Sequence, residues 1–138
     1  YSHTRYDILE GEVQSVRRPD VLIIEGLNVL QTGGAASTPF VSDFFNYSIY
    51  VDASEEDLES WFIERFFALR ATAFQSPDSF FHHFAELGDE QAGAVAREIW
   101  RSINLVNLHD NILPTRERAK MVLEKGHDHA VQAVRISR

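Results

Sequence analysis

Glu25 is the first side chain whose position in the sequence suggests chemistry. It follows residues 21–24 (VLII), four consecutive branched aliphatic residues. So short a run, with no polar stripe at helical spacing, predicts a strand that is buried on both faces. Ligands in open α/β sheets bind beyond the carboxyl ends of the strands, so an acid at this place is suited to a metal ion or a water molecule. From spacing alone, an acid that merely ends a strand in solvent explains Glu25 equally well.

A strand followed by an acid is common in phosphoryl-transfer enzymes, which also hold the phosphates in a glycine-rich loop. Among the seven glycines, only Gly88 and Gly93 have the G-x-x-x-x-G spacing of that loop. Ala94 and Val95 follow where the loop requires Lys and then Ser or Thr, and the pair falls in a helix-forming stretch. Residues 1–138 therefore lack the usual loop that binds a triphosphate.

Arg65 is a second candidate, because its place on a helix can be inferred. It follows Trp61 and Phe62 by four and three residues, so it shares the helix face of these aromatic side chains. A cation there either lies over the core surface or reaches into a cleft to neutralise a phosphoryl group during transfer. Arg116 and Arg118 leave a similar choice open between a solvated face and a phosphate clamp.

The histidines give weak signals for a metal site. His82 and His83 are adjacent, so on a helix their side chains point about 100° apart and make a poor metal pair. His127 and His129 could flank a turn, but a two-residue spacing without a third ligand is weak evidence for zinc. Ordinary surface histidines are the favoured interpretation for all four.

The elements that position these residues begin with a strand that ends at Asp52, because Ile49 and Val51 alternate with polar or aromatic neighbours. Ser54 with Asp57 three residues later predicts a capped helix that runs to about Ala73. Residues 76–79 (SPDS) break this helix, and a short aromatic helix over 79–87 follows. Most phenylalanines in this part are expected in the core, while a few could line a pocket for an apolar part of a substrate: Phe66, Phe67, Phe74, Phe80, Phe81 and Phe84.

The last third of the chain predicts one more helix and two strands. Asp89 can cap a helix whose apolar side includes Ala92, Trp100 and Ile103. After Pro114, residues 120–125 and 129–137 predict strands on either side of a glycine. Strands that alternate with helices indicate a layered α/β domain with a largely parallel sheet.

Composition limits the class of protein. The 138 residues have the length of one domain, with 44% hydrophobic residues and a formal net charge of −8. Such an acidic balance argues against nucleic acid or an anionic membrane as a partner, because both favour a basic face. The absence of cysteine excludes disulfides and is compatible with a cytoplasmic location. The chain has neither a run of about 20 apolar residues nor a signal peptide, and its start, without Met, suggests a fragment of a longer parent protein.

Several long segments, in order along nearly the whole chain, resemble type I bacterial pantothenate kinase. They are YSHTRYD, RPDVLIIEGLNVLQ, VSDFFNYSIYVDA, RFFALR, AFQSPDSFFHHFA and NILPTRERA. The resemblance implies a P-loop kinase related to uridine kinase and phosphoribulokinase, an α/β fold of three layers with a mainly parallel sheet. Residues 1–138 would form the C-terminal portion of a single kinase domain, from which the N-terminal P-loop part is absent.

The resemblance implies that the parent protein transfers the γ-phosphate of ATP to pantothenate with the help of Mg²⁺. The product is 4′-phosphopantothenate, in the first step of coenzyme A (CoA) biosynthesis, and CoA is implied as an inhibitor that competes with the nucleotide. The parent is expected to be a homodimer. Because the P-loop lysine and the catalytic base would precede Tyr1, residues 1–138 alone are expected to be inactive. The alternatives are a non-catalytic module for pantothenate or CoA binding or for dimerisation, and a kinase for another small hydroxyl substrate such as a nucleoside.

The resemblance also implies roles for single residues. Arg65 matches an arginine at the phosphoryl-transfer centre, and Glu25 matches an acid placed indirectly near magnesium. His129 matches a histidine that stacks near adenine, and His3 one that also contacts CoA. Contacts with pantothenate are implied for Tyr1, His3, Tyr6, Phe62, Arg65, Phe80, Phe81 and Asn104. Two departures concern Phe62 and Phe80, where better-known members have tyrosine, so a hydroxyl is lost. A third is Leu69 in the CoA-contacting wall, which leaves inhibition by CoA open.

Overall fold

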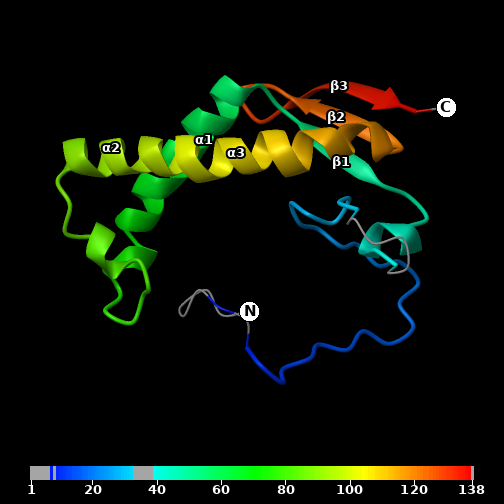
Figure 1. Cartoon of the computed structure of the whole chain (residues 1–138), viewed down its shortest axis with the longest axis horizontal. Helices are drawn as coiled ribbons and strands as arrows, with labels where there is room; N and C mark the ends of the chain where they lie inside the picture. The colour runs from blue at the N-terminus through cyan, green and yellow to red at the C-terminus, as the bar shows by residue number, and fades with distance from the viewer. Residues whose placement is uncertain (1–6, 8, 33–38, 138) are drawn as a thin grey trace. The chain divides into compact units, whose positions relative to one another are not determined.

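The computed structural model describes residues 7, 9–32 and 39–137 (Figure 1). These residues divide into two compact units. The first unit contains the described residues up to Ile23 together with Trp61–Glu98, and the second contains Ile24–Ser60 and the chain from Ile99 onward. Three residues with implied roles, Tyr1, His3 and Tyr6, lie outside the described residues.

The second unit contains a sheet of three strands in the order β1-β2-β3. These are β1 (Ile49–Asp52), β2 (Met121–Lys125) and β3 (Val131–Ile136), which lie side by side in Figure 1. All three were expected from the sequence and are confirmed. β1 and β2 are parallel, whereas β2 and β3 are antiparallel because a hairpin turn joins them. The described sheet is therefore mixed, and the expectation of a mainly parallel sheet is wrong for this part.

Helix α1 (Glu55–Arg70) follows β1, as the capping pattern predicts. The backbone N–H of Asp57 donates to Ser54 Oγ over 3.1 Å, and the Ser54 hydroxyl donates to Asp57 Oδ2 over 2.7 Å. The serine therefore satisfies a backbone N–H that has no partner within the first helical turn. The helix ends three residues before the expected Ala73, where a short 3₁₀ turn, Ala73–Gln75, begins.

The second predicted helix is confirmed as α2 (Asp89–Ile99). The chain continues helically through a π turn at Trp100–Asn104, α3 (Leu105–Asn107), a second π turn at Leu108–Ile112 and a 3₁₀ segment, Leu113–Arg118. Among the described residues, no helix is both long and apolar enough to cross a membrane.

The apolar side predicted for this helix is confirmed in part. Ala92, Ala96 and Trp100 are buried, whereas Ile103 is 60% exposed. The expectation for Ile103 is wrong because the π turn that begins at Trp100 changes the number of residues per turn and so the face that each residue occupies.

The aromatic stretch of the first unit forms turns around one 3₁₀ turn, His82–Phe84, instead of the helix expected over residues 79–87. Packing between rings holds it: the Phe66 ring lies 5.7 Å from that of Phe74 and 5.4 Å from that of Phe84, between centroids. Phe66 and Phe74 are buried. The prediction that most of these phenylalanines are core residues is confirmed only in part, because Phe67, Phe81 and Phe84 are partly buried and Phe80 is exposed.

The expectation of a buried strand over residues 21–24 is wrong for this structure. The segment has no strand geometry, and Val21 and Ile23 are 80% and 85% exposed. A parallel strand becomes buried only when strands pair with its edges and other elements cover its faces. No described strand pairs with this segment, so its sequence pattern alone cannot produce burial. Glu25 consequently lies in an exposed irregular segment just before a turn, and not at the end of a strand.

The two faces of the sheet differ in what covers them. On one face, Tyr50 and Val122 are buried and pack with Leu30 and Ala119. The other face carries two rows of apolar side chains, which the strand register places opposite one another: Ile49, Met121 and Ile136, then Val51, Leu123 and Val134. In β1 and β3 these residues are 51–66% exposed. We call this surface the open sheet face.

Candidate functional site

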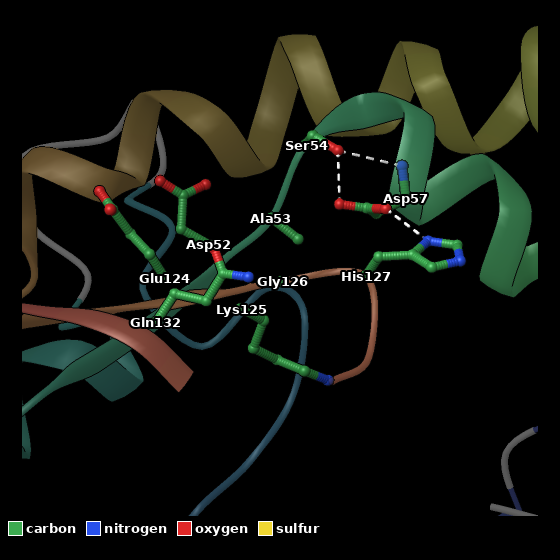
Figure 2. A pocket seen from close by; sticks show the side chains of 9 residues that line it. All are labelled: Asp52, Ala53, Ser54, Asp57, Glu124, Lys125, Gly126, His127 and Gln132. Carbon is green, nitrogen blue, oxygen red and sulfur yellow. Dashed lines mark hydrogen bonds and ion pairs between the residues drawn. The ribbon is translucent and has the colours of Figure 1, made fainter. Parts of the chain in front are cut away.

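An open cavity of about 480 Å³ lies in the second unit, where β1 and β2 end. Asp52 is the last residue of β1 and Lys125 the last of β2. The carboxyl ends of parallel strands are the usual ligand-binding edge of an α/β sheet. Figure 2 shows the lining side chains, which come from both strands, the start of α1, the hairpin turn and β3: Asp52, Ala53, Ser54, Asp57, Glu124, Lys125, Gly126, His127 and Gln132.

At one end of the cavity, Ser54, Asp57 and His127 form a connected group (Figure 2). His127 Nδ1 lies 2.8 Å from Asp57 Oδ1, in addition to the bonds between Asp57 and Ser54. The hydrogen bond from Ser54, followed by that from His127, holds the pKa of the Asp57 carboxyl below its ordinary value. The hairpin turn is thereby tied to the N-terminus of α1.

We predict that Ser54→Ala destabilises the protein by about 1 kcal/mol at pH 7, because it removes the N-cap of α1. A carboxyl whose pKa is lowered in the folded state stabilises the fold above its unfolded pKa, and this contribution disappears as the pH falls through the folded value. The difference between wild type and Ser54→Ala should therefore shrink below about pH 4. Urea unfolding at pH 7 and pH 3 measures it. Ser54→Thr, which keeps a hydroxyl, is the control, and an equal loss in both variants would contradict the prediction.

At the other end of the cavity, two carboxylates are bound by arginines. Arg116 Nε lies 2.7 Å from Asp52 Oδ2, and Arg116 Nη2 lies 3.5 Å from Glu124 Oε1. Arg135 Nε lies 2.6 Å from the same Glu124 oxygen. The bond to Asp52 raises the pKa of Arg116, and burial raises the pKa of the nearby Tyr50 hydroxyl. We call Asp52, Glu124, Arg116 and Arg135 the strand-end ion cluster.

The two arginines of the 3₁₀ segment therefore have structural partners, and neither sequence-based alternative describes them fully. Arg116 is bound to the strand-end carboxylates. Arg118 donates from Nε to the Leu30 carbonyl over 3.2 Å and from Nη2 to Ser42 Oγ over 3.5 Å. These bonds connect the end of the long helical segment to strand β1 and to the loops before it.

His129 lies in the turn that follows the cavity-lining residues. Its backbone N–H donates to the Gly126 carbonyl over 2.9 Å, and Asp128 Oδ1 accepts from the Ala130 N–H over 3.0 Å. His129 has a φ of 65°, in the left-handed region that few residues other than glycine adopt. The turn thus fixes the backbone of His129, which lies two residues after His127 of the cavity lining. The His129 side chain itself does not line the cavity.

The other described site candidates do not line this cavity. In the second unit, Glu25 is exposed and Asn104 is partly buried in a π turn. In the first unit, Arg65 is exposed on α1 and Phe62 is partly buried three residues before it.

The structure brings one predicted pair together. The rings of Phe80 and Phe81 lie 5.1 Å apart, edge to face, and Phe80 is 58% exposed. Phe81 also stacks on Phe84 with their centroids 6.0 Å apart. An exposed ring supported by partly buried ones is suited to contact an apolar group.

Sequence reasoning missed the cavity, although the signal for part of it was present. Asp52 ends a predicted strand in the same way that Glu25 was expected to, and residues 120–125 were predicted as another strand. If these strands are parallel neighbours, Asp52 and Lys125 must lie at one edge. The contribution of Asp57, His127 and Gln132 depends on how the hairpin turn meets α1, and no local pattern shows that.

No metal site can be assigned within the described residues. They contain no group of three or more His, Asp or Glu side chains arranged to hold an ion. Glu25, the residue implied near magnesium, is exposed and belongs to no such group among the described residues.

The second unit is a mixed α/β unit with a polar cavity at the carboxyl ends of two parallel strands, which is the place where α/β proteins usually bind ligands. Comparison with known proteins gives a more specific assignment. No family model matches the chain. Over all 138 residues it is 59% identical to a protein of Sorangium cellulosum named pantothenate kinase, and covers 45% of it.

Two further relatives with the same name give similar values. The chain is 60% identical to that of Corynebacterium efficiens and 58% identical to that of Mycobacterium sp. strain KMS, over 136 residues in each case, and covers 40% and 43% of them. The chain thus spans less than half the length of these curated relatives. It is homologous to a portion of the pantothenate kinases, which confirms the resemblance found in the sequence.

Proposed function

We propose that the parent protein of this chain is a pantothenate kinase that uses ATP to form 4′-phosphopantothenate, the first step of CoA biosynthesis. The observation that carries the proposal is 58–60% identity, over practically the whole chain, to proteins named pantothenate kinase. Catalysis in this reaction consists mainly of positioning the phosphoryl group and stabilising its charge. The chain would supply one wall of the site.

We further propose a three-layer P-loop kinase fold for the parent. The open sheet face supports it, because parallel strands normally have helices over both faces and here only the Tyr50 face is covered. β1 pairs with β2 alone among the described strands, which leaves its other edge for an additional strand. The remaining length of the relatives is sufficient for the missing layer, the further strands and the phosphate loop.

Within this fold, the cavity at the strand ends would take the nucleotide. Two observations support this placement: it lies at the carboxyl ends of β1 and β2, and His129 follows its lining residues in the same turn. His129 would stack near adenine, and the exposed ring of Phe80 with Phe81 would cover pantothenate. Asn104 would pair with the polar groups of pantothenate. Arg65 would neutralise charge on the transferring phosphoryl group.

Three expectations about the parent accompany this proposal: inhibition by CoA in competition with ATP, a homodimer, and a cytoplasmic location. The first is tested by ATP-dependent kinetics at several CoA concentrations, and the second by light scattering. If CoA left the apparent KM for ATP unchanged, the proposed competition with ATP would be wrong.

The decisive test is a coupled ADP-release assay on the full-length parent with ATP, Mg²⁺ and pantothenate. ADP release that depends on pantothenate, with mass-spectrometric detection of 4′-phosphopantothenate, is expected. A panel of nucleosides and other small alcohols serves as the control for substrate class. If ADP release occurred only with a nucleoside or alcohol of the panel, that compound class and not pantothenate would be the substrate. Pantothenate binding without turnover would favour the non-catalytic module.

A further inference from the structure

The lining of the cavity carries an excess of negative charge. Three carboxylates face it, from Asp52, Asp57 and Glu124, whereas Lys125 is the one lysine or arginine in the lining. With His127 neutral, the formal charges of the lining therefore add up to minus two. Like charges repel over several ångströms in a partly desolvated site, so such a lining by itself disfavours a phosphate-bearing ligand.

Two arginines behind the lining alter this balance. Arg116 contacts both Asp52 and Glu124, and Arg135 contacts Glu124, at the distances given above for the strand-end ion cluster. Their two positive charges offset the minus two of the lining, and Arg116 Nη1 also lies 3.7 Å from the exposed carboxylate of Glu117. The Arg116 side chain is 28% exposed and Arg135 67%, so Arg116 is the better shielded from solvent and its charge the less screened.

We propose that Arg116 is a specificity-determining residue that sets the ligand charge the cavity accepts. It neutralises Asp52 and Glu124 and occupies their oxygens, so that an anionic nucleotide can enter beside them. This inference depends on the proposed function, which puts the nucleotide in the cavity. The guanidinium suits the role because it stays charged at any accessible pH and its planar group can contact two carboxylates at once.

A purely structural clamp is the competing explanation, since Arg116 also connects the ends of β1 and β2 to the 3₁₀ segment. The two roles differ in their response to ligand charge. Loss of a clamp weakens every ligand of the cavity alike. Loss of charge balance weakens ATP much more than adenosine, which has the same base and sugar without the phosphates, and salt reduces the difference.

The experiment is calorimetric titration of ATP and adenosine into the full-length parent and its variants, at low salt and at 0.5 M NaCl. For Arg116→Gln we expect ATP affinity to fall about tenfold at low salt, adenosine affinity to change less than about twofold, and the ATP effect to shrink at high salt. Arg116→Lys, which keeps the charge, should retain ATP affinity within about threefold. Arg118→Gln is the matched control, because it removes the same charge from the same segment but not from the carboxylates.

Equal losses for ATP and adenosine, or equal effects of Arg116→Gln and Arg118→Gln, would overturn the role of Arg116 while leaving the nucleotide site intact. A wild-type parent that binds no ATP would instead overturn the proposed function, and this inference with it. If Arg116→Gln does not fold, Arg135→Gln decides the question, because it removes the exposed partner of Glu124. Arg135→Gln should then also lower ATP affinity more than adenosine affinity, by a smaller factor than Arg116→Gln. An unchanged ratio of ATP to adenosine affinity would contradict the proposal.

Discussion

The isolated 138 residues are expected to show no pantothenate-dependent ADP release above background, under conditions in which the full-length parent turns over. The reason is chemical. Transfer of a phosphoryl group needs a grip on the β- and γ-phosphates, and the G-x-x-x-x-G-K-[ST] pattern that supplies it does not occur in residues 1–138. The pair Gly88 and Gly93 has the spacing, but it spans the loop before α2 and the helix itself, and Gly93 is buried against the Phe67 and Arg97 side chains.

The assay needs a control for folding, because the open sheet face gives the isolated chain a surface suited to self-association. Size-exclusion chromatography followed by circular dichroism on the monomeric fraction provides it. The ADP-release assay is then run on that fraction beside the parent at equal molar concentration. Turnover by a folded monomer of residues 1–138 would contradict the prediction and would require a phosphate-binding arrangement that the sequence pattern does not show.

Local sequence patterns correctly predicted the elements whose hydrogen-bonding and packing partners are present in this chain. β1 and the cap of α1 follow from a few adjacent residues, and the Ser54–Asp57 bonds formed as the sequence indicates. The hairpin of β2 and β3 likewise needs only two apolar runs around Gly126. In each case the hydrogen bonds that stabilise the element join residues near one another or strands that are both present.

For residues 21–24, the local sequence pattern did not predict the structure correctly. Their sequence has the composition of a buried strand, yet in this structure they are exposed and unpaired as a strand. Burial is a property of neighbours as well as of the segment, and a pattern of aliphatic residues cannot supply the strands that would flank it. The two apolar rows of the open sheet face show the same dependence on neighbours. Their residues are apolar, but no layer covers them in this structure.

The candidate site divides along similar lines. Residue types and spacing pointed to Arg65 and Glu25, which the structure places in different compact units. The cavity, in contrast, is formed by side chains that come together only when the hairpin turn lies against the N-terminus of α1. Asp52 and Lys125 could have been anticipated from the ends of two strands, but the pairing of Arg116 with Asp52 spans 64 positions in sequence and has no local signature.

Substitution of Arg65 is expected to have a large effect on catalysis by the parent. Arg65→Ala in the full-length parent is expected to lower kcat by about 10²–10³-fold, with a small change in KM for pantothenate, because a fixed positive charge acts mainly on the charge that develops in the transition state. Its position supports this, since the side chain is exposed on the middle of α1, where it costs little to present a cation to a ligand. Steady-state kinetics with both substrates measures the two constants.

The control is Arg97→Ala, which removes the same charge from an exposed position of α2 and should leave kcat within about twofold. Thermal melting separates catalysis from folding, because substitution of an exposed helical residue by alanine changes stability by only about 0.5 kcal/mol. Arg65→Lys should recover part of the rate, since it restores the charge without the planar guanidinium. If Arg65→Ala kept kcat within threefold of wild type, Arg65 would be a surface cation that lies over the core, and the phosphoryl group would have to be stabilised by residues outside this chain.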